Sequence, residues 1–159
     1  MRLQGKVAIV TGAGKGIGEA IATTFAEQGA HVIALERDRA AASALRKTLA
    51  GHEVKTMDVT DRAAVTRLVR QVLKAHGSID ILVNNAVSYT ERPVHACTDE
   101  EWEGTIDSAL SSVFRFCRAV LPAMMQARRG SIVNLCSINQ IVANPNLAAY
   151  TAAKGGIHA

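Results

Sequence analysis

The stretch VAIVTGAGKGIGEAIA, residues 7–22, decides the fold because three local signals follow one another in it. A short apolar run predicts a buried strand, a glycine cluster predicts a tight turn, and the residues after it favour a helix. Glycines let such a turn approach a phosphate group, which then lies against the unpaired N–H groups and positive end of the helix. A side chain at Gly16 or Gly18 would occupy that space. The stretch therefore predicts a strand, a phosphate-binding loop and a helix.

Strand-length apolar runs and helical stretches alternate through the rest of the chain. The runs are Val7–Val10, His31–Leu35, Val54–Val59, Ile79–Val83 and Ile132–Leu135. Between the third and fourth runs, apolar residues from Val65 to Leu73 recur at the spacing of one helix face. Regular alternation of this kind places parallel strands in one sheet with helices on both faces. We therefore predict an α/β fold with a doubly wound parallel sheet of five buried strands.

Capping signals mark where the helices begin and end. Three glycines stand at helix-to-strand junctions, where a residue at positive φ would end the helix: Gly29, Gly51 and Gly77. Thr98 and Glu101 have the spacing of a capping box, and we expect them to open a long helix that ends near Arg128. No repeat or linker interrupts this order, so we expect residues 1–159 to form one domain.

Composition and charge exclude several classes of protein. The chain has 159 residues, of which 48% are hydrophobic and 20% charged, as in a globular domain. No apolar run approaches the roughly 18 residues of a membrane span, and no secretory segment follows Met1, so we expect a cytoplasmic protein with no membrane partner. The net charge of +4 is spread over the predicted helices without an aromatic groove or basic arm, so we expect no nucleic-acid partner.

The spacing of cysteines and histidines indicates neither a disulfide framework nor a metal site. Cys97, Cys117 and Cys136 are odd in number and far apart. His95 and Cys97 form a lone H-x-C, and no second cluster completes four ligands. We therefore expect free thiols and no bound metal.

Charged residues after the second run bear on the choice of a dinucleotide. Glu36 stands eighteen residues beyond Gly18, at the expected end of the second strand. A carboxylate there accepts hydrogen bonds from ribose hydroxyls and repels a 2′-phosphate. This favours NAD over NADP, against the opposite signal of the basic residues Lys15 and Arg37.

A serine and a Y-x-x-x-K pair stand near the end of the sequence. Tyr150 and Lys154 are spaced i,i+4, so both side chains share a helix face and the ammonium lies about one turn from the phenol. A nearby positive charge lowers the pKa of a phenol from its ordinary value of about 10, which allows proton exchange near neutral pH. Ser137 stands thirteen residues before Tyr150, at the expected end of the fifth strand.

Together these motifs resemble the short-chain dehydrogenase/reductase family, which implies a Rossmann-type fold. The spacing G-x-x-x-G-x-G of Gly12, Gly16 and Gly18 is similar to that of the family, as is the set of Ser137, Tyr150 and Lys154. Asp58 and Val59 resemble its adenine-contacting pair, and Asn84-Asn85-Ala86 resembles its N-N-A-G motif. The resemblance implies these cofactor contacts: Gly12, Lys15, Gly16, Ile17, Gly18, Glu36, Asp58, Val59, Asn84, Asn85, Ala86, Tyr150 and Lys154. Taken alone, Asp58 could equally cap the next helix, and Asn84 could equally satisfy backbone groups between strands.

The resemblance also implies roles for the three polar residues near the C-terminal end. Tyr150 exchanges the proton, Lys154 lowers the pKa of Tyr150 and holds the nicotinamide ribose, and Ser137 hydrogen-bonds the reacting oxygen. We expect an oxidoreductase for a small-molecule secondary alcohol or ketone, and a homo-oligomer for the full-length protein. The alternatives are a non-catalytic dinucleotide-binding protein and, more remotely, an RNA-binding surface with strongly salt-dependent affinity.

The sequence departs from the family pattern in three places. Val87 replaces the glycine of N-N-A-G, and Ala109 replaces the asparagine of the catalytic tetrad. Family members continue beyond the position of Ala159 into two more strands and a substrate loop. We therefore expect a fragment whose domain is incomplete at its C-terminus, with Lys154 on a frayed helix end and little activity of its own.

Overall fold

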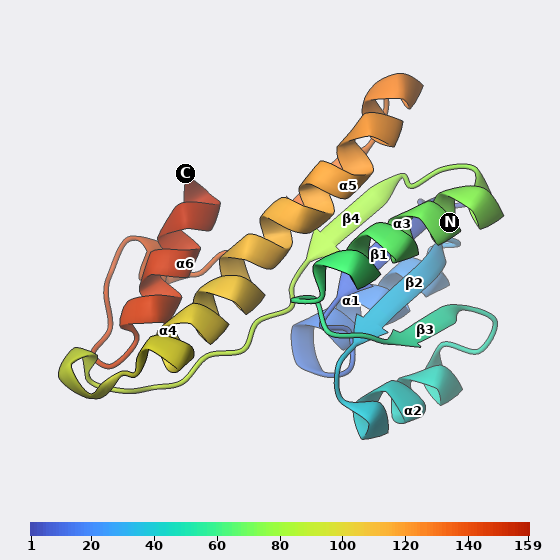
Figure 1. Ribbon diagram of the computed structural model, residues 1–159. Coiled ribbons are helices and arrows are strands. Elements are labelled where there is room, and N and C mark those ends of the chain that lie inside the picture. The colour runs from blue at the N-terminus through green and yellow to red at the C-terminus, as the bar shows by residue number, and fades with distance from the viewer.

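The computed structural model describes residues 1–159 and contains one five-stranded parallel sheet (Figure 1). The strands lie in the order β3-β2-β1-β4-β5. Their bounds are β1 (Val7–Thr11), β2 (His31–Glu36), β3 (Glu53–Thr56), β4 (Ile81–Asn84) and β5 (Ser131–Asn134). The predicted doubly wound α/β sheet is therefore confirmed, with β1 at its centre.

Helices cover both faces of the sheet. Their bounds are α1 (Gly16–Glu27), α2 (Arg39–Thr48), α3 (Arg62–His76), α4 (Asp99–Ile106), α5 (Ser112–Ala127) and α6 (Ala148–His158), with short turns η1 (Val94–Ala96), η2 (Asp107–Ser111) and η3 (Ile138–Gln140). Side chains of α3 and α5 pack on one face, and those of α1 and α2 on the other. Helices α4 and α6 lie side by side beyond the sheet (Figure 1).

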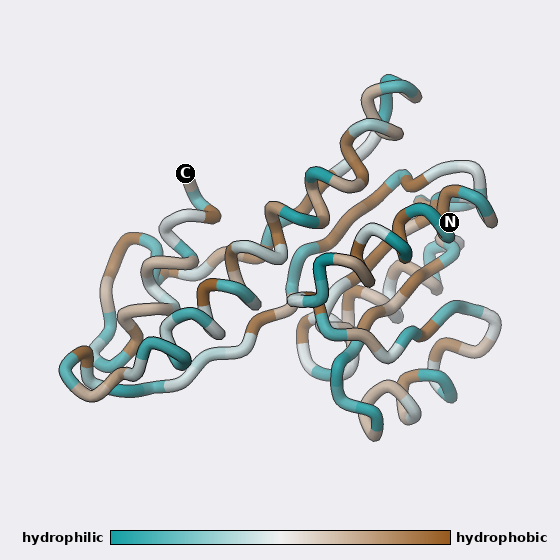
Figure 2. The backbone as a smooth tube through the Cα atoms, in the orientation of Figure 1, coloured by the Kyte–Doolittle hydropathy of each residue, from teal (hydrophilic) through white to brown (hydrophobic).

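Alternate residues of each inner strand enter opposite cores. In β1, Val7 and Ile9 join the core under α3 and α5, whereas Ala8 and Val10 join the core under α1 and α2. Both faces are buried, so the strand is a continuous apolar run instead of an alternating one. Figure 2 shows this as hydrophobic colour along the strands at the centre of the sheet.

The two outer strands differ from the prediction of five buried strands. Only Val54 of β3 is buried, and no residue of β5 is. Each of them pairs on one side only, which leaves its other edge open. Strand β3 also ends at Thr56, before Asp58 and Val59, because the Asp58 carboxylate accepts hydrogen bonds from the backbone and hydroxyl of Thr60 and closes a turn.

The predicted caps are confirmed, and the predicted long helix contains a π-helical turn. Three glycines have positive φ after their helices: Gly29, Gly51 and Gly77. Thr98 and Glu101 form both bonds of the capping box at the start of α4. The π-turn η2 joins α4 to α5 and includes Ala109, and such turns are frequent at functional sites. None of the helices combines the length and the apolar character that a membrane crossing requires.

We predict that Phe116→Ala lowers the free energy of unfolding by about 3–5 kcal/mol, because the ring is fully buried between α5 and the sheet. Phe114, two residues away on the same helix, is 58% exposed and is the matched control. Its ring lies under the Arg118 guanidinium, so Phe114→Ala should cost at most about 1 kcal/mol. Urea unfolding followed by circular dichroism measures both, and equal losses would contradict the assigned core.

Candidate functional site

The loop after β1 is fastened to the end of β4 by the buried Thr11 hydroxyl. This hydroxyl donates to the carbonyl oxygen of Val83 (3.3 Å) and accepts from the backbone N–H groups of Asn85 and Ala86 (3.0 Å each). The Asn85 amide in turn donates to the carbonyl oxygens of Thr11 (3.1 Å) and Gly12 (2.9 Å). These bonds join the carboxyl ends of adjacent strands, where open α/β sheets bind ligands.

Two of the predicted glycines are required because backbone lies against them. A Cβ on Gly12 would stand 2.8 Å from the Cα of Ala86, and one on Gly18 would stand 2.1 Å from the carbonyl oxygen of Gly12. Gly16 differs, because a Cβ there would meet no protein atom within 4 Å. Its requirement is the positive φ of 59°, and the open space beside it is available to a ligand.

Helix α1 begins without a side-chain cap. Its N-cap residue, Lys15, makes no capping hydrogen bond, whereas Asp38, Asp61 and Thr98 cap α2, α3 and α4. The first N–H groups of α1 therefore keep their hydrogen-bonding capacity, and the helix dipole adds a partial positive charge. This end of α1 suits a phosphate group.

The Glu36 carboxylate lies over the glycine loop. One of its oxygens accepts from the Gly14 N–H (2.9 Å), and the other accepts from the Asp38 N–H (2.8 Å). A Cβ on Gly14 would stand 2.5 Å from the Glu36 side chain, so this glycine is needed for the contact. The carboxylate oxygens keep further lone pairs for ribose hydroxyls. Arg37 lies 3.8 Å from the Asp58 carboxylate across the same region.

A cleft of about 1100 Å³ at the carboxyl edge of the sheet collects most of the predicted cofactor residues. Those on its lining are Gly12, Lys15, Ile17, Glu36, Asp58, Val59, Asn85 and Ala86. The predicted residues that do not line it are Gly16, Gly18, Asn84, Tyr150 and Lys154. Val87, Ser88 and Tyr89 form its far end, so the cleft extends from the β2–α2 turn to the segment after β4.

The structure distinguishes the two readings of Asn84 and of Asp58. Asn84 is buried, and its amide donates to the side-chain oxygen of Asn134 (2.8 Å), so it links β4 to β5 instead of lining the cleft. Asp58 lines the cleft, and Asp61 is the residue that caps α3. Asp58 therefore does not cap the next helix, and Asn84 bonds a side chain of the adjacent strand and not the backbone groups that its alternative reading required.

Lys154 is held firmly, which contradicts the expected frayed helix end. Helix α6 continues to His158, and the Lys154 ammonium is buried and donates to the carbonyl oxygen of Leu135 (2.5 Å). Its burial lowers the pKa of the ammonium. The ammonium lies 5.6 Å from the centre of the Tyr150 ring, as the i,i+4 spacing predicts. The Tyr150 ring packs on that of Tyr89, with centroids 4.6 Å apart.

Ser137 lies beyond the fifth strand and does not end it as predicted. Strand β5 stops at Asn134, and Ser137 instead begins the turn η3, where its hydroxyl oxygen accepts from the Asn139 N–H (3.2 Å). The structure brings this segment to α6 through Cys136, whose thiol donates to the Lys154 carbonyl oxygen (3.2 Å). No hydrogen bond joins the side chains of Ser137, Tyr150 and Lys154 to one another.

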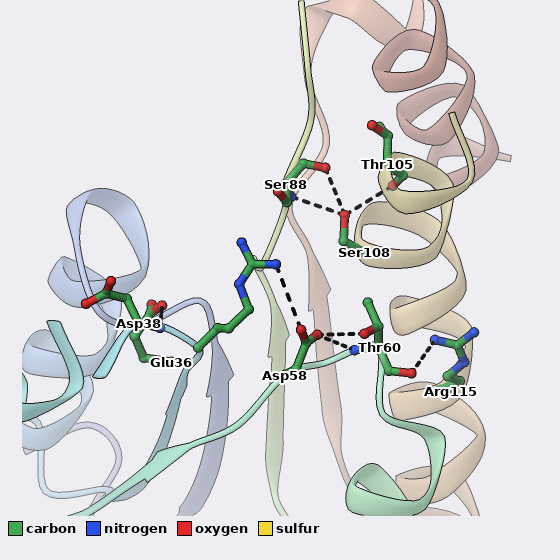
Figure 3. A network of polar contacts seen from close by, with 9 residues as sticks. Glu36, Asp38, Asp58, Thr60, Ser88, Thr105, Ser108 and Arg115 are labelled. Carbon is green, nitrogen blue, oxygen red and sulfur yellow. Dashed lines mark hydrogen bonds and ion pairs between the residues drawn. The ribbon is translucent and has the colours of Figure 1, made fainter. Parts of the chain in front are cut away.

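Two hydroxyl groups that support the site, those of Thr11 and Ser108, belong to residues that were not identified from sequence as site residues. Thr11 fastens the loop, and Ser108 in η2 holds the segment after β4 by donating to the carbonyl oxygen of Ser88 (2.9 Å) and accepting from its N–H (3.2 Å) (Figure 3). Ala109, next in the chain, is buried in the same turn. Thr11 carried a signal, since it is a polar residue directly continuing an apolar run. Lone serines such as Ser88 and Ser108 carry none.

Known proteins are similar to this chain over nearly its whole length. The family described as "short chain dehydrogenase" matches residues 6–159. The 3-oxoacyl-[acyl-carrier-protein] reductase FabG of Escherichia coli K12 is 40% identical over 158 residues, and that of Thermotoga maritima is 38% identical over 161. Both alignments cover 99% of this chain and 65% of the relative, so the chain spans about two-thirds of their length.

Solved structures agree in fold as well. A metagenomic short-chain oxidoreductase in complex with NADP superposes with a TM-score of 0.92 at 37% identity, covering 99% of this chain and 74% of that one. A putative short-chain dehydrogenase/reductase from Burkholderia xenovorans superposes with a TM-score of 0.90 at 42% identity, covering 98% of this chain and 66% of that one.

We predict that Thr11→Val destabilises the protein by about 2–4 kcal/mol and weakens dinucleotide binding. The valine keeps the shape but leaves the N–H groups of Asn85 and Ala86 without their partner, and each such loss costs about 1–3 kcal/mol. Thr11→Ser keeps the hydroxyl and is the matched control, with most of the stability retained. Urea unfolding and cofactor titration by fluorescence measure the two effects. A valine variant as stable as the wild type would show that the hydroxyl does not fasten the loop.

Proposed function

We propose, because this chain belongs to the short-chain dehydrogenase family, that it forms the cofactor-binding and proton-transfer part of an oxidoreductase acting on a secondary alcohol or ketone. The course of the cleft is the main support for this proposal. It begins at the glycine loop and Glu36 and ends at Tyr89, against whose ring Tyr150 packs. A dinucleotide along the cleft would therefore bring its reacting ring toward the Tyr150–Lys154 pair.

The residues of the loop fit a nicotinamide dinucleotide. The absent side chains at Gly12 and Gly18 allow the close backbone turn, the open space at Gly16 admits a ligand, and the uncapped end of α1 suits its pyrophosphate. When bound, this cofactor supplies or accepts the hydride, which no side chain of the protein can do. The protein positions the reactants and moves the proton.

Tyr150 is the proposed proton donor and acceptor, and Lys154 is proposed to act on its pKa. A positive charge between 5 and 6 Å away favours the phenolate by about 3 kcal/mol at an effective dielectric constant of about 20. Burial keeps the Lys154 ammonium away from water that would weaken this effect. One N–H of the ammonium is used by Leu135, which leaves two for the phenol oxygen or for ribose hydroxyls.

Ser137 is the proposed hydrogen-bond donor to the reacting oxygen. Its hydroxyl oxygen already accepts a bond from the Asn139 N–H, which fixes the oxygen, while its own proton remains free to donate. The curated relatives named above are reductases of 3-oxoacyl groups, which are ketones, and this supports a carbonyl compound as the substrate class. The homo-oligomer implied by the family resemblance stays a prediction.

We propose that the preference for NAD or NADP depends on the charges at the β2–α2 turn. Glu36 opposes a 2′-phosphate, whereas Arg37, Arg39 and Lys15 line the same cleft and attract one. The sequence alone favoured NAD, but the solved relative that binds NADP gives no reason to rank NADP lower. We therefore propose a nicotinamide dinucleotide whose form is set by Glu36 against these basic residues.

We predict that Tyr150→Phe lowers kcat/KM by about 10²–10⁴-fold while dinucleotide affinity changes by less than about twofold, since the phenol oxygen serves proton transfer. Tyr89→Phe keeps the packed pair of rings and is the matched control, with activity near that of the wild type. The assay follows NADH or NADPH absorbance with 3-oxoacyl thioesters, hydroxy acids and polyols, using the longest form of the protein that its gene encodes.

Two outcomes of that assay would count against the proposal. Retained turnover in Tyr150→Phe would remove this residue as the acid and base. Tight dinucleotide binding with no turnover of any substrate class would favour the non-catalytic alternative, for which Val87 and Ala109 are the relevant departures from the family pattern.

We predict that neutralising Glu36 and neutralising its neighbour Arg37 change the ratio of NADPH to NADH affinity in opposite directions. Glu36→Ala removes the carboxylate that repels a 2′-phosphate, so it should shift the ratio of NADPH to NADH affinity toward NADPH by about tenfold, or roughly 1.4 kcal/mol. Arg37→Ala removes an attractive charge and should shift the same ratio toward NADH. Fluorescence titration of each variant with both cofactors measures the ratio, and shifts of the same sign in both variants would contradict the charge argument.

A further inference from the structure

Three side chains with metal-ligand chemistry meet at the edge of the sheet opposite the cleft. His31 begins β2, Glu53 begins β3, and His76 ends α3. The Nε2 atoms of His31 and His76 lie 3.3 Å and 2.7 Å from the same oxygen, Oε1 of Glu53. The two imidazole rings are 4.4 Å apart, and one ligand atom from each residue lies within 4.8 Å of the others.

The fold accounts for this meeting. Glu53 pairs with Ile33 across the parallel strands, and Ile33 lies two residues after His31, so His31 and Glu53 share a face of the sheet. That is the face that α3 covers. Gly77, at a φ of 76°, ends α3 directly after His76, which places the imidazole at this edge.

We propose that His31, Glu53 and His76 form a binding site for a divalent transition-metal ion, zinc being the one that the ligands suit best. Two imidazole nitrogens and one carboxylate oxygen are a common ligand set for this ion. Tetrahedral bonds of about 2.0–2.1 Å place neighbouring ligand atoms about 3.3 Å apart. The separation of His31 Nε2 from Glu53 Oε1, 3.3 Å, equals this value, and that of His76 Nε2, 2.7 Å, requires Glu53 and His76 to move apart by about 0.6 Å. The third separation, between the two histidines, is no more than 4.8 Å, so the rings need only a modest approach. All three side chains are between 23% and 33% exposed, so they can make this adjustment and the ion can enter from solvent.

The surroundings orient the carboxylate for this role. The Lys55 ammonium lies 2.8 Å from the other Glu53 oxygen, so Oε1 faces the histidines. The Glu53 carboxylate therefore presents this oxygen to a cation bound between the two imidazoles. The negative end of the α3 dipole further favours a cation beside His76.

A third histidine, His52, lies beside His31 and is engaged elsewhere. The Nδ1 atom of His52 accepts from the Val32 N–H (3.3 Å), so neutral His52 carries its proton on Nε2 and offers no lone pair to an ion. The fourth position on the ion is thus left to water. The ion would hold the starts of β2 and β3 to the end of α3, far from the cleft, so its effect is on stability and is independent of the oxidoreductase function.

The test is metal binding by the purified chain after treatment with a chelator. Calorimetric titration with Zn²⁺ should give one ion per chain with a micromolar Kd. His76→Gln and His31→Gln should each weaken binding at least tenfold. His95→Gln and His158→Gln alter exposed histidines elsewhere and are the matched controls, with affinity unchanged. Equal affinity in wild type and His76→Gln, or no saturable binding up to millimolar Zn²⁺, would overturn the proposal.

Two further measurements keep the proposal testable if a variant folds poorly. Excess Zn²⁺ should raise the Tm of the wild-type chain by about 5 °C, and EDTA should reverse the rise. The absorption spectrum of the Co²⁺-loaded wild type should show nitrogen and oxygen ligands only. A thiolate charge-transfer band would place the ion on a cysteine and overturn the site. Dinucleotide binding, measured in parallel, should be the same with and without metal. A chain that binds no metal would therefore contradict the metal site without bearing on the proposed oxidoreductase function.

Discussion

Gly12 and Ala86 lie so close together that their backbones leave no room for a side chain between them. This contact joins the loop after β1 to the end of β4, and the hydrogen bonds of Thr11 and Asn85 fix it from both sides. The positions of two neighbouring segments depend on this contact. It sets where α1 begins and directs the uncapped end of that helix toward the cleft, and it fixes the start of the segment that carries Tyr89. A shift of this contact would move both ends of the cleft at once.

The proposed acid and base residues are positioned differently from the residues that line the cleft. The residues that line the cleft come from the segments that follow β1, β2, β3 and β4, whereas Tyr150 and Lys154 lie on α6, which packs on α4 and the π-turn beyond the sheet. The Lys154 ammonium and the Cys136 thiol connect α6 to the end of β5. In the fifth strand only Ile132 packs against the core, and the other residues are exposed.

The two edges of the sheet hold groups of different chemistry. At the carboxyl edge, helix N-termini and backbone N–H groups favour anions, as the open start of α1 shows. At the amino edge, the end of α3 meets the starts of β2 and β3, where imidazoles and a carboxylate gather. The helices that cover a parallel sheet run in the opposite direction to its strands. Their N-termini therefore lie at the carboxyl edge of the sheet and their C-termini at the amino edge. The proposed anion site at one edge and the proposed cation site at the other are both consistent with this shared chain direction.

The sequence by itself determined the features that depend on neighbours along the chain. The β1–loop–α1 unit, the capping box at Thr98, the helix ends at Gly29, Gly51 and Gly77, and the shared helix face of Tyr150 and Lys154 are local, so spacing and residue type suffice to predict them. The position of Glu36 at the end of β2 was predicted for the same reason. Only the tertiary structure decided which strands have one partner, and therefore that β3 and β5 are exposed. It also decided that Asn84 links two strands, that Lys154 is anchored, and that His31, Glu53 and His76 meet. Each of these depends on residues at least 19 positions apart in sequence, whose approach is set by strand order and helix packing and leaves no local pattern to read.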